Sequence, residues 1–184
     1  MGNLCTLNIR VSAPDDDHHH YEATNATHDV AEQLFDVDPK EISKVPLQNE
    51  LIEARVYKVY DGDTCSILYK LGDRVMKTSL RIVGIDCPEL RPKRLTEEMK
   101  VMEAKAAAVC RDFVKSLILE KIVQVMFVGN DKYGGRLLAN IYIPGDDLML
   151  LSDVMITQGY AKPYDGAKKE PWTYEELNRL LKIA

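Results

Sequence analysis

The sequence has no long apolar run, no paired-cysteine motif and no excess of positive charge, and each absence excludes a class of protein. No segment approaches the roughly 18 apolar residues that a transmembrane helix requires. The chain begins without the positive cluster and apolar stretch of a secretory leader, so we expect it to stay inside the cell that makes it. Its four cysteines have no C-x-x-C spacing, which disfavours a zinc site or a disulfide framework.

The negative charge is concentrated at one end of the chain. The formal net charge of −5 would oppose binding to an anionic polymer such as nucleic acid. Residues 1–50, however, hold 10 of the 29 acidic and 3 of the 24 basic residues, a net charge of −7. Residues 51–184 therefore carry 19 acids and 21 bases, a net of +2. This partition predicts an acidic, flexible tail over residues 1–50 and one folded domain over residues 51–184.

The hydrophobic pattern of the second part predicts five strands and three helices. Alternating residues from Ile52 to Tyr60 indicate a first strand, and Asp61-Gly62 is typical of a hairpin turn. The predicted strands cover residues 52–60, 64–71, 75–85, 122–128 and 136–143, and the predicted helices cover residues 96–117, 148–158 and 173–181. The order favours an α+β, mainly β fold: a five-stranded OB-fold barrel with about three helices and an N-terminal extension.

Five charged residues of this domain have the chemistry that phosphodiester hydrolysis needs. Taken singly, each is an ordinary turn or ion-pair residue, but they occur together in one domain. Asp63 and Asp86 would offer hard oxygen ligands to a cation, and Glu89 would face an attacking water. Arg81 and Arg136 could hold the phosphate with forked donors and stabilise its transition state.

Four sequence motifs resemble the staphylococcal (thermo)nuclease family. In the family's order they are VYDGDT (59–64), RIVGIDCPE (81–89), DKYGGRLLA (131–139) and QGYA (158–161). Each motif is weak alone, but the four together are specific and span most of residues 54–164. The resemblance implies an OB-type barrel that cleaves DNA and RNA with little sequence specificity and leaves 3′-phosphate ends.

The resemblance also implies one calcium ion. Asp63 and Asp86 match the family's metal-binding aspartates, and Cys87 matches the residue whose main-chain carbonyl is a further ligand. The family often has threonine at the position of Cys87, but a carbonyl ligand does not depend on its side chain. Two carboxylates and a carbonyl could also hold Mg²⁺ or Mn²⁺, so the residues alone leave the metal open.

The remaining site residues follow from the same match. Glu89 corresponds to the general base or water-positioning residue, and Arg81 and Arg136 correspond to the two phosphate-binding arginines. Lys132, Tyr133 and Tyr164 lie at or near positions that contact the nucleotide. Two glycines precede Arg136 where the family has one, so we expect the extra residue to be absorbed as a bulge.

The N-terminus fits a lipidation pattern. Met1-Gly2-Asn3-Leu4-Cys5-Thr6 matches M-G-x-x-x-[ST], with Gly2 as a myristoylation site and Cys5 as a site for a palmitoyl chain. Two chains would attach the protein to a membrane if a eukaryotic cell or its virus made it. A bacterial source would exclude this hypothesis.

Two alternatives to an enzyme remain. The first is a non-catalytic nuclease-like OB module that binds nucleic acid or protein. It is disfavoured because a degenerate module would be expected to lose some of the five charged residues, and all five are present. The second is a membrane-tethered interaction protein, which lipidation without hydrolysis would favour. The sequence does not determine the oligomeric state.

Overall fold

The structure is a computed structural model that describes residues 38, 45–93, 95–132, 135–145 and 148–183. Most of the predicted acidic tail lies outside the described residues, and so do Gly2, Cys5 and Tyr133. The last residues before the predicted domain are described. Val45 is buried, and the Asn49 N–H donates a hydrogen bond of 2.8 Å to the carbonyl of Phe127.

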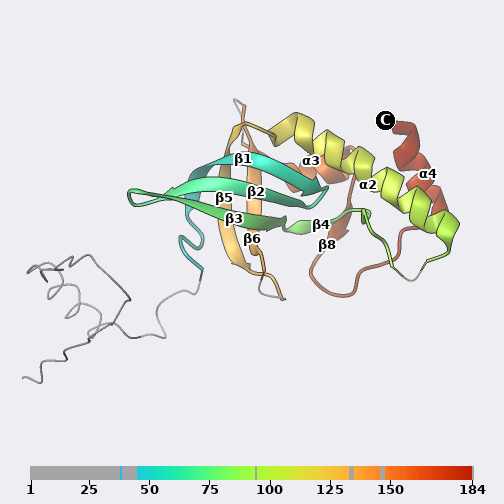
Figure 1. The fold of residues 1–184 in the computed structure, drawn as a ribbon, viewed down its shortest axis with the longest axis horizontal. Coiled ribbons are helices and arrows are strands. Elements are labelled where there is room, and N and C mark those ends of the chain that lie inside the picture. Colours follow the sequence, from blue (N-terminus) through green and yellow to red (C-terminus); the bar gives the residue numbers. More distant parts are fainter. Residues whose placement is uncertain (1–37, 39–44, 94, 133–134, 146–147, 184) are drawn as a thin grey trace, which may run out of the picture. The chain divides into compact units, whose positions relative to one another are not determined.

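Five strands form a closed barrel (Figure 1). They are β1 (Leu51–Asp61), β2 (Thr64–Leu71), β3 (Arg74–Ile82), β5 (Ile122–Asn130) and β6 (Leu137–Ile143). The order around the sheet is β3-β2-β1-β5-β6, and a parallel pairing of β3 with β6 closes it. This is the five-stranded OB-fold barrel that the sequence pattern predicts, and both predicted hairpins, β1–β2 and β2–β3, are present.

The alternation predicted along β1 is correct only as far as Val56. Ala54 and Val56 are buried, as expected, but the next inward residue is Val59, while Tyr60 is exposed. The pairing of β1 with β2 shifts register between Val56 and Lys58 and again between Val59 and Asp61. Such irregularities exchange the faces of a strand and twist it more strongly. They occur where β1 approaches the turn that carries Asp63.

Three helices are described, as predicted: α2 (Glu97–Ile118), α3 (Leu151–Thr157) and α4 (Tyr174–Ile183). Thr96 caps α2, because its side-chain oxygen accepts a hydrogen bond of 3.3 Å from the Met99 N–H. Thr173 and Glu176 form the predicted capping box of α4, with hydrogen bonds of 2.8 Å and 3.3 Å. Helices α2 and α4 pack side by side at one end of the domain (Figure 1).

The buried face of α2 differs from the predicted one. The apolar repeat that predicts this helix consists of Met99, Met102, Ala106, Val109, Phe113 and Leu117, and of these Ala106 is fully buried while the other five are only partly buried. The fully buried positions run along the neighbouring stripe: Ala106, Ala107, Cys110, Val114 and Ile118. Successive side chains on a helix are rotated by about 100° around its axis, so a row of residues shifted by one position in the sequence faces a different part of the protein. Glu103 lies on this buried stripe.

Three short strands were not predicted as separate elements. The strand expected over residues 75–85 ends at Ile82, and β4 (Gly84–Asp86) pairs with β8 (Lys162–Tyr164). Gly84 takes a positive φ of 83°, which favours glycine at this change of direction. The helix predicted from Leu148 starts only at Leu151, because β7 (Met149–Leu150) extends the main sheet. The β4–β8 pairing sets Asp86 beside Lys162.

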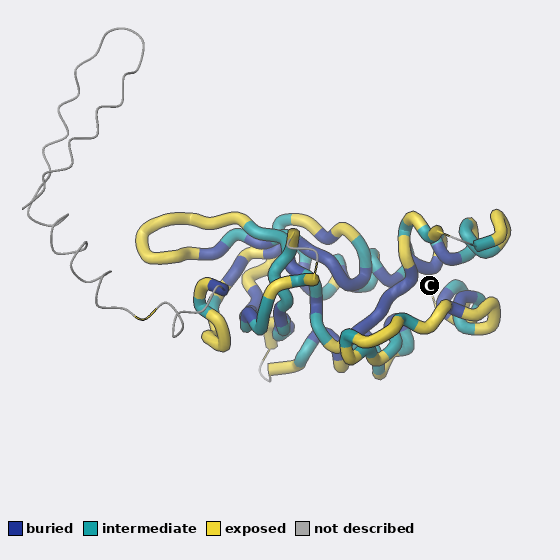
Figure 2. Tube along the Cα trace, turned by 90° about the horizontal axis from the view of Figure 1, so that it is seen from below, coloured by how far each residue is buried: buried dark blue, intermediate teal, exposed yellow. Residues whose placement is uncertain are grey.

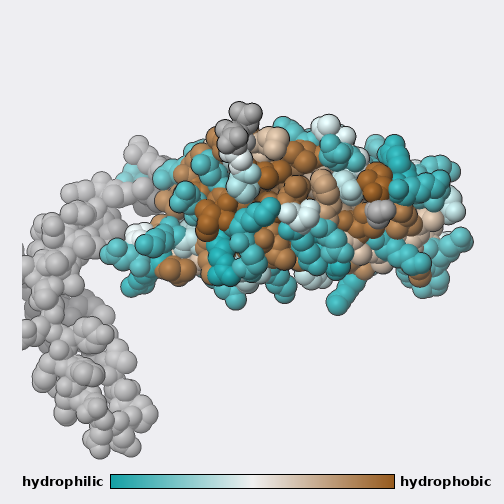
Figure 3. Space-filling view, turned by 90° about the horizontal axis from the view of Figure 1, so that it is seen from above, coloured by the Kyte–Doolittle hydropathy of each residue, from teal (hydrophilic) through white to brown (hydrophobic). Residues whose placement is uncertain are grey.

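One apolar core fills the barrel and continues beneath the helices (Figure 2). By contrast, residues 70–77 at the tip of the β2–β3 hairpin are all exposed. On the face drawn in Figure 3, polar side chains dominate the ends and apolar side chains gather over the middle. Among the described residues, no helix is long and apolar enough to cross a membrane.

Candidate functional site

The site begins at the turn between β1 and β2. Asp63 is 4% exposed, and in the β2–β3 ladder Arg81 lies opposite the neighbouring Thr64. Arg81 therefore reaches Asp63, with Nη2 2.6 Å from Oδ2 and Nη1 donating to Oδ1 at 3.3 Å. Arg81 Nη2 is buried in this ion pair. A guanidinium carries five N–H donors, and Arg81 lines the cleft described below, so it has donors beyond those that face Asp63.

The Asp63 carboxyl is less acidic than an ordinary aspartate. Its pKa is raised to about 6, mainly by burial and also by the nearby Asp61 carboxylate, against the opposing effects of Arg81 and Thr64. A carboxylate in this setting gains much from a cation, because a bound cation offsets both burial and the repulsion from Asp61.

Closure of the barrel brings Arg136 to the same point. The parallel pairing sets Arg81 opposite Leu138, so Arg136, two residues earlier, lies next to the β1–β2 turn. Its Nη1 donates to Thr64 Oγ1 at 3.1 Å, and that hydroxyl donates to Asp63 Oδ1 at 2.8 Å. Despite the extra glycine before it, Arg136 is thus linked to the site.

Asp131 holds the other side of the Arg136 guanidinium. Its Oδ2 accepts from Nε at 3.1 Å and from Nη2 at 2.7 Å. Burial raises the pKa of Asp131, but the contacts with Arg136 outweigh it and the net pKa is lowered. The loop between β5 and β6 is closed by a hydrogen bond of 3.0 Å from the Asp131 N–H to the Arg136 carbonyl. Arg136 is therefore fixed on two sides.

Cys87, the residue after Asp86, packs directly against the β1–β2 turn. A Cβ placed on Gly62 would lie 2.7 Å from Cys87 Sγ, closer than side chains tolerate, so only glycine lets the two segments meet. Asp86 is 4% exposed and Cys87 is 3% exposed. Burial, reinforced by Asp63, raises the pKa of the Cys87 thiol. A protonated thiol is a poor metal ligand, which leaves the main-chain carbonyl as the ligand that Cys87 can offer.

These donors fit a hard divalent cation. Asp86 Oδ1 is buried and lies 2.6 Å from Lys169 Nζ, so the structure already places a positive charge at this oxygen. Two carboxylates and a carbonyl are oxygen ligands of the kind that Ca²⁺ and Mg²⁺ prefer. Within the described ranges, no group of three or more His, Cys, Asp and Glu side chains is assembled for metal binding. Water would therefore have to complete the coordination shell.

Glu89 lies at the edge of this site. Its side chain is 53% exposed, which leaves it accessible to water. Its main-chain N–H donates to Glu103 Oε1 at 3.0 Å, so helix α2 anchors the segment after β4. Glu103 is itself 6% exposed, and burial raises its pKa.

Lys169 contacts both Asp86 and Glu89. Its Nζ lies 2.6 Å from Asp86 Oδ1 and 3.0 Å from Glu89 Oε1. Burial lowers the pKa of Lys169, but the contacts with the two carboxylates outweigh it and the net pKa is raised. The lysine is charged at neutral pH.

A cleft of about 430 Å³ opens beside these groups. Four of its lining residues are cationic and two are acidic: Arg81, Lys132, Arg136 and Lys169, with Glu89 and Asp131. Lys132 Nζ donates to the Gly166 carbonyl at 2.7 Å, and the Tyr164 hydroxyl donates to the Ala167 carbonyl at 2.8 Å. Lys132 and Tyr164, the two predicted substrate-binding residues that the structure describes, therefore line the cleft, and their hydrogen bonds fix the segment at its rim.

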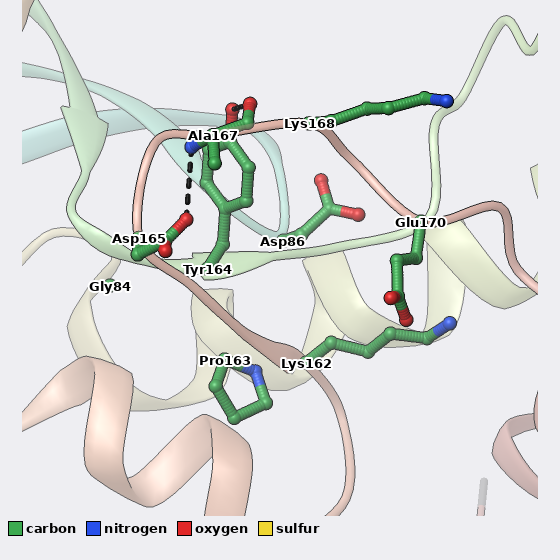
Figure 4. A pocket seen from close by; sticks show the side chains of 9 residues that line it. All are labelled: Gly84, Asp86, Lys162, Pro163, Tyr164, Asp165, Ala167, Lys168 and Glu170. Carbon is green, nitrogen blue, oxygen red and sulfur yellow. Dashed lines mark hydrogen bonds between the residues drawn. The ribbon is translucent and has the colours of Figure 1, made fainter.

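A second pocket, of about 740 Å³, is lined by Gly84, Asp86 and residues of the segment 162–170 (Figure 4). Asp86 and Tyr164 border it, and Asp165 accepts a hydrogen bond of 2.9 Å from the Ala167 N–H. The Lys168 side chain extends away from the Asp86 carboxylate (Figure 4).

The structure brings together the described residues that the sequence singled out and adds three more. These are Asp131, Glu103 and Lys169. Asp131 lies within the motif DKYGGRLLA, so the sequence could have identified it as a site residue. A glutamate within the apolar repeat of a predicted helix, Glu103, is a weak sequence signal of a buried functional side chain. Lys169 lies in a polar loop, and nothing in its sequence context indicated a role in the site.

Comparison with known proteins agrees with this geometry. The family model described as "Staphylococcal nuclease homologue" matches residues 79–184. Proteins named "Uncharacterized endonuclease" from Escherichia coli O157:H7 and Escherichia coli are each 30% identical over 127 residues. Each match covers 69% of this chain and 64% of the relative. The family match spans more than half of the chain and includes Arg81, Asp86, Glu89 and Arg136, so the chain belongs to the staphylococcal nuclease family.

Proposed function

We propose that this chain is a calcium-dependent endonuclease that hydrolyses phosphodiester bonds of DNA, RNA or both and leaves 3′-phosphate ends. The observation that carries the proposal is the convergence of two arginines on Asp63, Arg81 directly and Arg136 through Thr64, beside a buried Asp86 that is paired with Lys169. The name of the bacterial relatives, endonuclease, supports it. Contacts from arginine and lysine to phosphate carry no base information, so little sequence specificity is expected.

The side chains divide the work of the reaction. Glu89 would orient a water and accept its proton as the water oxygen attacks phosphorus. The bond from phosphorus to the 5′ oxygen breaks, and that oxygen leaves as a hydroxyl group with a proton from solvent, while Glu89 returns the proton it accepted to solvent, so one water is consumed for each bond cut. Arg81 and Arg136 would hold the non-bridging oxygens and stabilise the charge that develops on them.

Asp63, Asp86 and the Cys87 carbonyl would hold the metal ion. A bound Ca²⁺ would act as a Lewis acid on the phosphate and offset its negative charge. Lys132 and Tyr164 would contact the nucleotide from the rim of the cleft, and Tyr133, outside the described residues, is proposed to do the same.

The test is degradation of single-stranded DNA, duplex DNA and RNA with Ca²⁺, Mg²⁺ or EDTA. Wild-type protein is compared with Glu89→Ala and Arg136→Ala, and the product ends are identified by their response to a phosphatase. We expect Ca²⁺-dependent cleavage that both substitutions remove. Folded wild-type protein that binds nucleic acid but cuts none of the substrates with any metal would leave the binding module as the function.

The pH dependence of calcium binding follows from Asp63. Its pKa of about 6 means that the carboxylate is ionised above pH 6 and protonated below it. Below pH 6 a cation must displace this proton, so the apparent Kd should rise by about tenfold per pH unit. Calorimetric titrations at pH 5, 6, 7 and 8 at constant ionic strength measure this. An ordinary aspartate, with its pKa near 4, would instead give a constant Kd from pH 5 to pH 7.

Glu103 is expected to support cleavage through Glu89. Glu103→Met removes the acceptor of the Glu89 N–H, and we expect kcat to fall by about tenfold, the equivalent of one lost hydrogen bond. Glu103→Gln keeps an oxygen at this position and should retain kcat within about threefold. Steady-state kinetics should show KM unchanged in both. Glu98→Met, an exposed position on the same helix, is the matched control, and equal losses in Gln and Met variants would contradict the positioning role.

Membrane attachment through Gly2 and Cys5 is part of the proposal only for a eukaryotic or viral source. Metabolic labelling with a myristate analogue, compared with Gly2→Ala, tests it; absence of label in the wild type would exclude it. Otherwise we expect the protein to remain free inside the cell.

A further inference from the structure

The segment that follows β8, here named the 165–172 loop, is tied to its surroundings along its length. Its start is held by the Lys132 Nζ bond to the Gly166 carbonyl and by the Tyr164 hydroxyl bond to Ala167. At its end, Lys162 Nζ donates to the Pro171 carbonyl at 3.2 Å and lies 4.5 Å from the ring centre of Trp172, which is buried. Lys169 lies between these anchors, so contacts on both sides of it in the sequence fix its position.

Lys169 contacts two carboxylates at once. Its Nζ makes an ion pair with Glu89 Oε1, at 3.0 Å, and a closer one with Asp86 Oδ1, at 2.6 Å. Asp86 is a proposed metal ligand and Glu89 is not. A divalent cation would therefore compete with Lys169 for Asp86 and leave its contact with Glu89 in place.

Asp86 needs a cation in any state of the protein. Its side chain is 6% exposed, and a buried carboxylate without a positive partner is strongly unfavourable. Lys169 meets this need in the metal-free protein. A divalent cation bound to Asp86 Oδ1 would approach the ammonium group at a distance where two positive charges repel each other strongly.

We propose that Lys169 is an internal counter-cation of the metal site: it pairs with Asp86 and Glu89 in the metal-free protein, releases Asp86 when a divalent cation binds, and then positions the Glu89 carboxylate. This inference rests on the proposed function for its second half only. The first half concerns metal binding and does not require cleavage.

The decisive experiment is a calorimetric titration of the metal-free full chain with Ca²⁺, in the absence of nucleic acid. Lys169→Met removes the competing charge, and we expect the Kd for Ca²⁺ to fall by about tenfold. Lys168→Met is the matched control, because it makes the same charge change one residue earlier, where the side chain is exposed and points away from Asp86 (Figure 4). Its Kd should stay within about twofold of wild type. Lys169→Arg keeps the charge and should resemble wild type.

Kinetics test the positioning half. With Ca²⁺ saturating, Lys169→Met should lower kcat by about tenfold with KM nearly unchanged, since Glu89 loses its partner while the phosphate-binding arginines remain. Lys169→Met would then bind Ca²⁺ more tightly and cleave more slowly than wild type. General damage to the fold would weaken both metal binding and cleavage, so it cannot explain this combination. Should Lys169→Met fail to fold in a thermal melt, Lys169→Gln takes its place in both measurements.

The outcomes separate this inference from the proposed function. A Kd for Lys169→Met equal to or weaker than that of wild type, or equal to that of Lys168→Met, overturns it. Failure of every variant to bind Ca²⁺ overturns it as well. Tighter Ca²⁺ binding by Lys169→Met in a wild type that cleaves no nucleic acid supports the counter-cation and rejects the nuclease.

Discussion

Replacement of Arg136 with alanine is expected to lower kcat for phosphodiester cleavage by about a thousandfold. The guanidinium is fixed by Asp131 on one side and by Thr64 on the other, so it meets the phosphate with little reorganisation. Arg136→Lys keeps the charge but loses the forked donors, and should recover no more than about tenfold of the loss. Single-turnover cleavage of a labelled oligonucleotide at saturating Ca²⁺ measures the chemical step.

Arg55→Ala is the matched control for this experiment. Arg55 also pairs with a carboxylate, Glu120, but both side chains are about half exposed, away from the cleft residues. We expect its kcat to equal that of wild type. A similar loss in Arg55→Ala and Arg136→Ala, or a loss of less than about fivefold in Arg136→Ala, would remove Arg136 from the catalytic residues.

Asp86→Asn is expected to raise the Kd for Ca²⁺ by at least about 100-fold and to abolish Ca²⁺-dependent cleavage. The substitution keeps the shape of a buried side chain but removes one of the two carboxylates that the site offers a cation. It also leaves Lys169 beside a neutral amide, and the positive charge of this lysine, no longer balanced by Asp86, would repel the metal ion. Calorimetry gives the Kd, and a thermal melt checks that the variant is folded.

Asp165→Asn makes the same change in a carboxylate that borders the same pocket as Asp86 (Figure 4). Asp165 is exposed, and its carboxylate accepts from the Ala167 N–H of its own loop. Calcium affinity should therefore change little. We expect only Asp165→Asn to bind Ca²⁺ with a Kd within threefold of the wild-type value. If Asp86→Asn did so as well, Asp86 would not be a metal ligand.

The sequence predicted the elements whose signals are local. Strands β1, β2 and β3 and their two hairpins follow from alternation and turn residues, and α2 follows from its cap and its apolar repeat. Predictions were wrong where a neighbour distant in sequence decides the conformation. The β1 alternation breaks at a bulge against β2, β4 forms only because β8 lies beside it, and α3 starts late because Met149 and Leu150 join β6.

The site shows the same division. Asp63, Asp86, Glu89, Arg81 and Arg136 are identifiable in the sequence because each lies in a short motif at a turn or strand end. Their mutual placement depends on barrel closure, since the contact of Arg136 with Thr64 joins residues 72 positions apart. The Lys169 contact with Glu89 spans 80 positions.

By itself the sequence determined the barrel, its family and the carboxylates and arginines of the candidate site, because local patterns and motifs of neighbouring residues encode them. Only the tertiary structure decided which charges are neutralised by which partners. Arg81 is committed to Asp63, Arg136 is clamped between Asp131 and Thr64, and Lys169 occupies the oxygen of Asp86 that a metal would need. Electrostatic pairing depends on distance and burial, and the closed fold sets both.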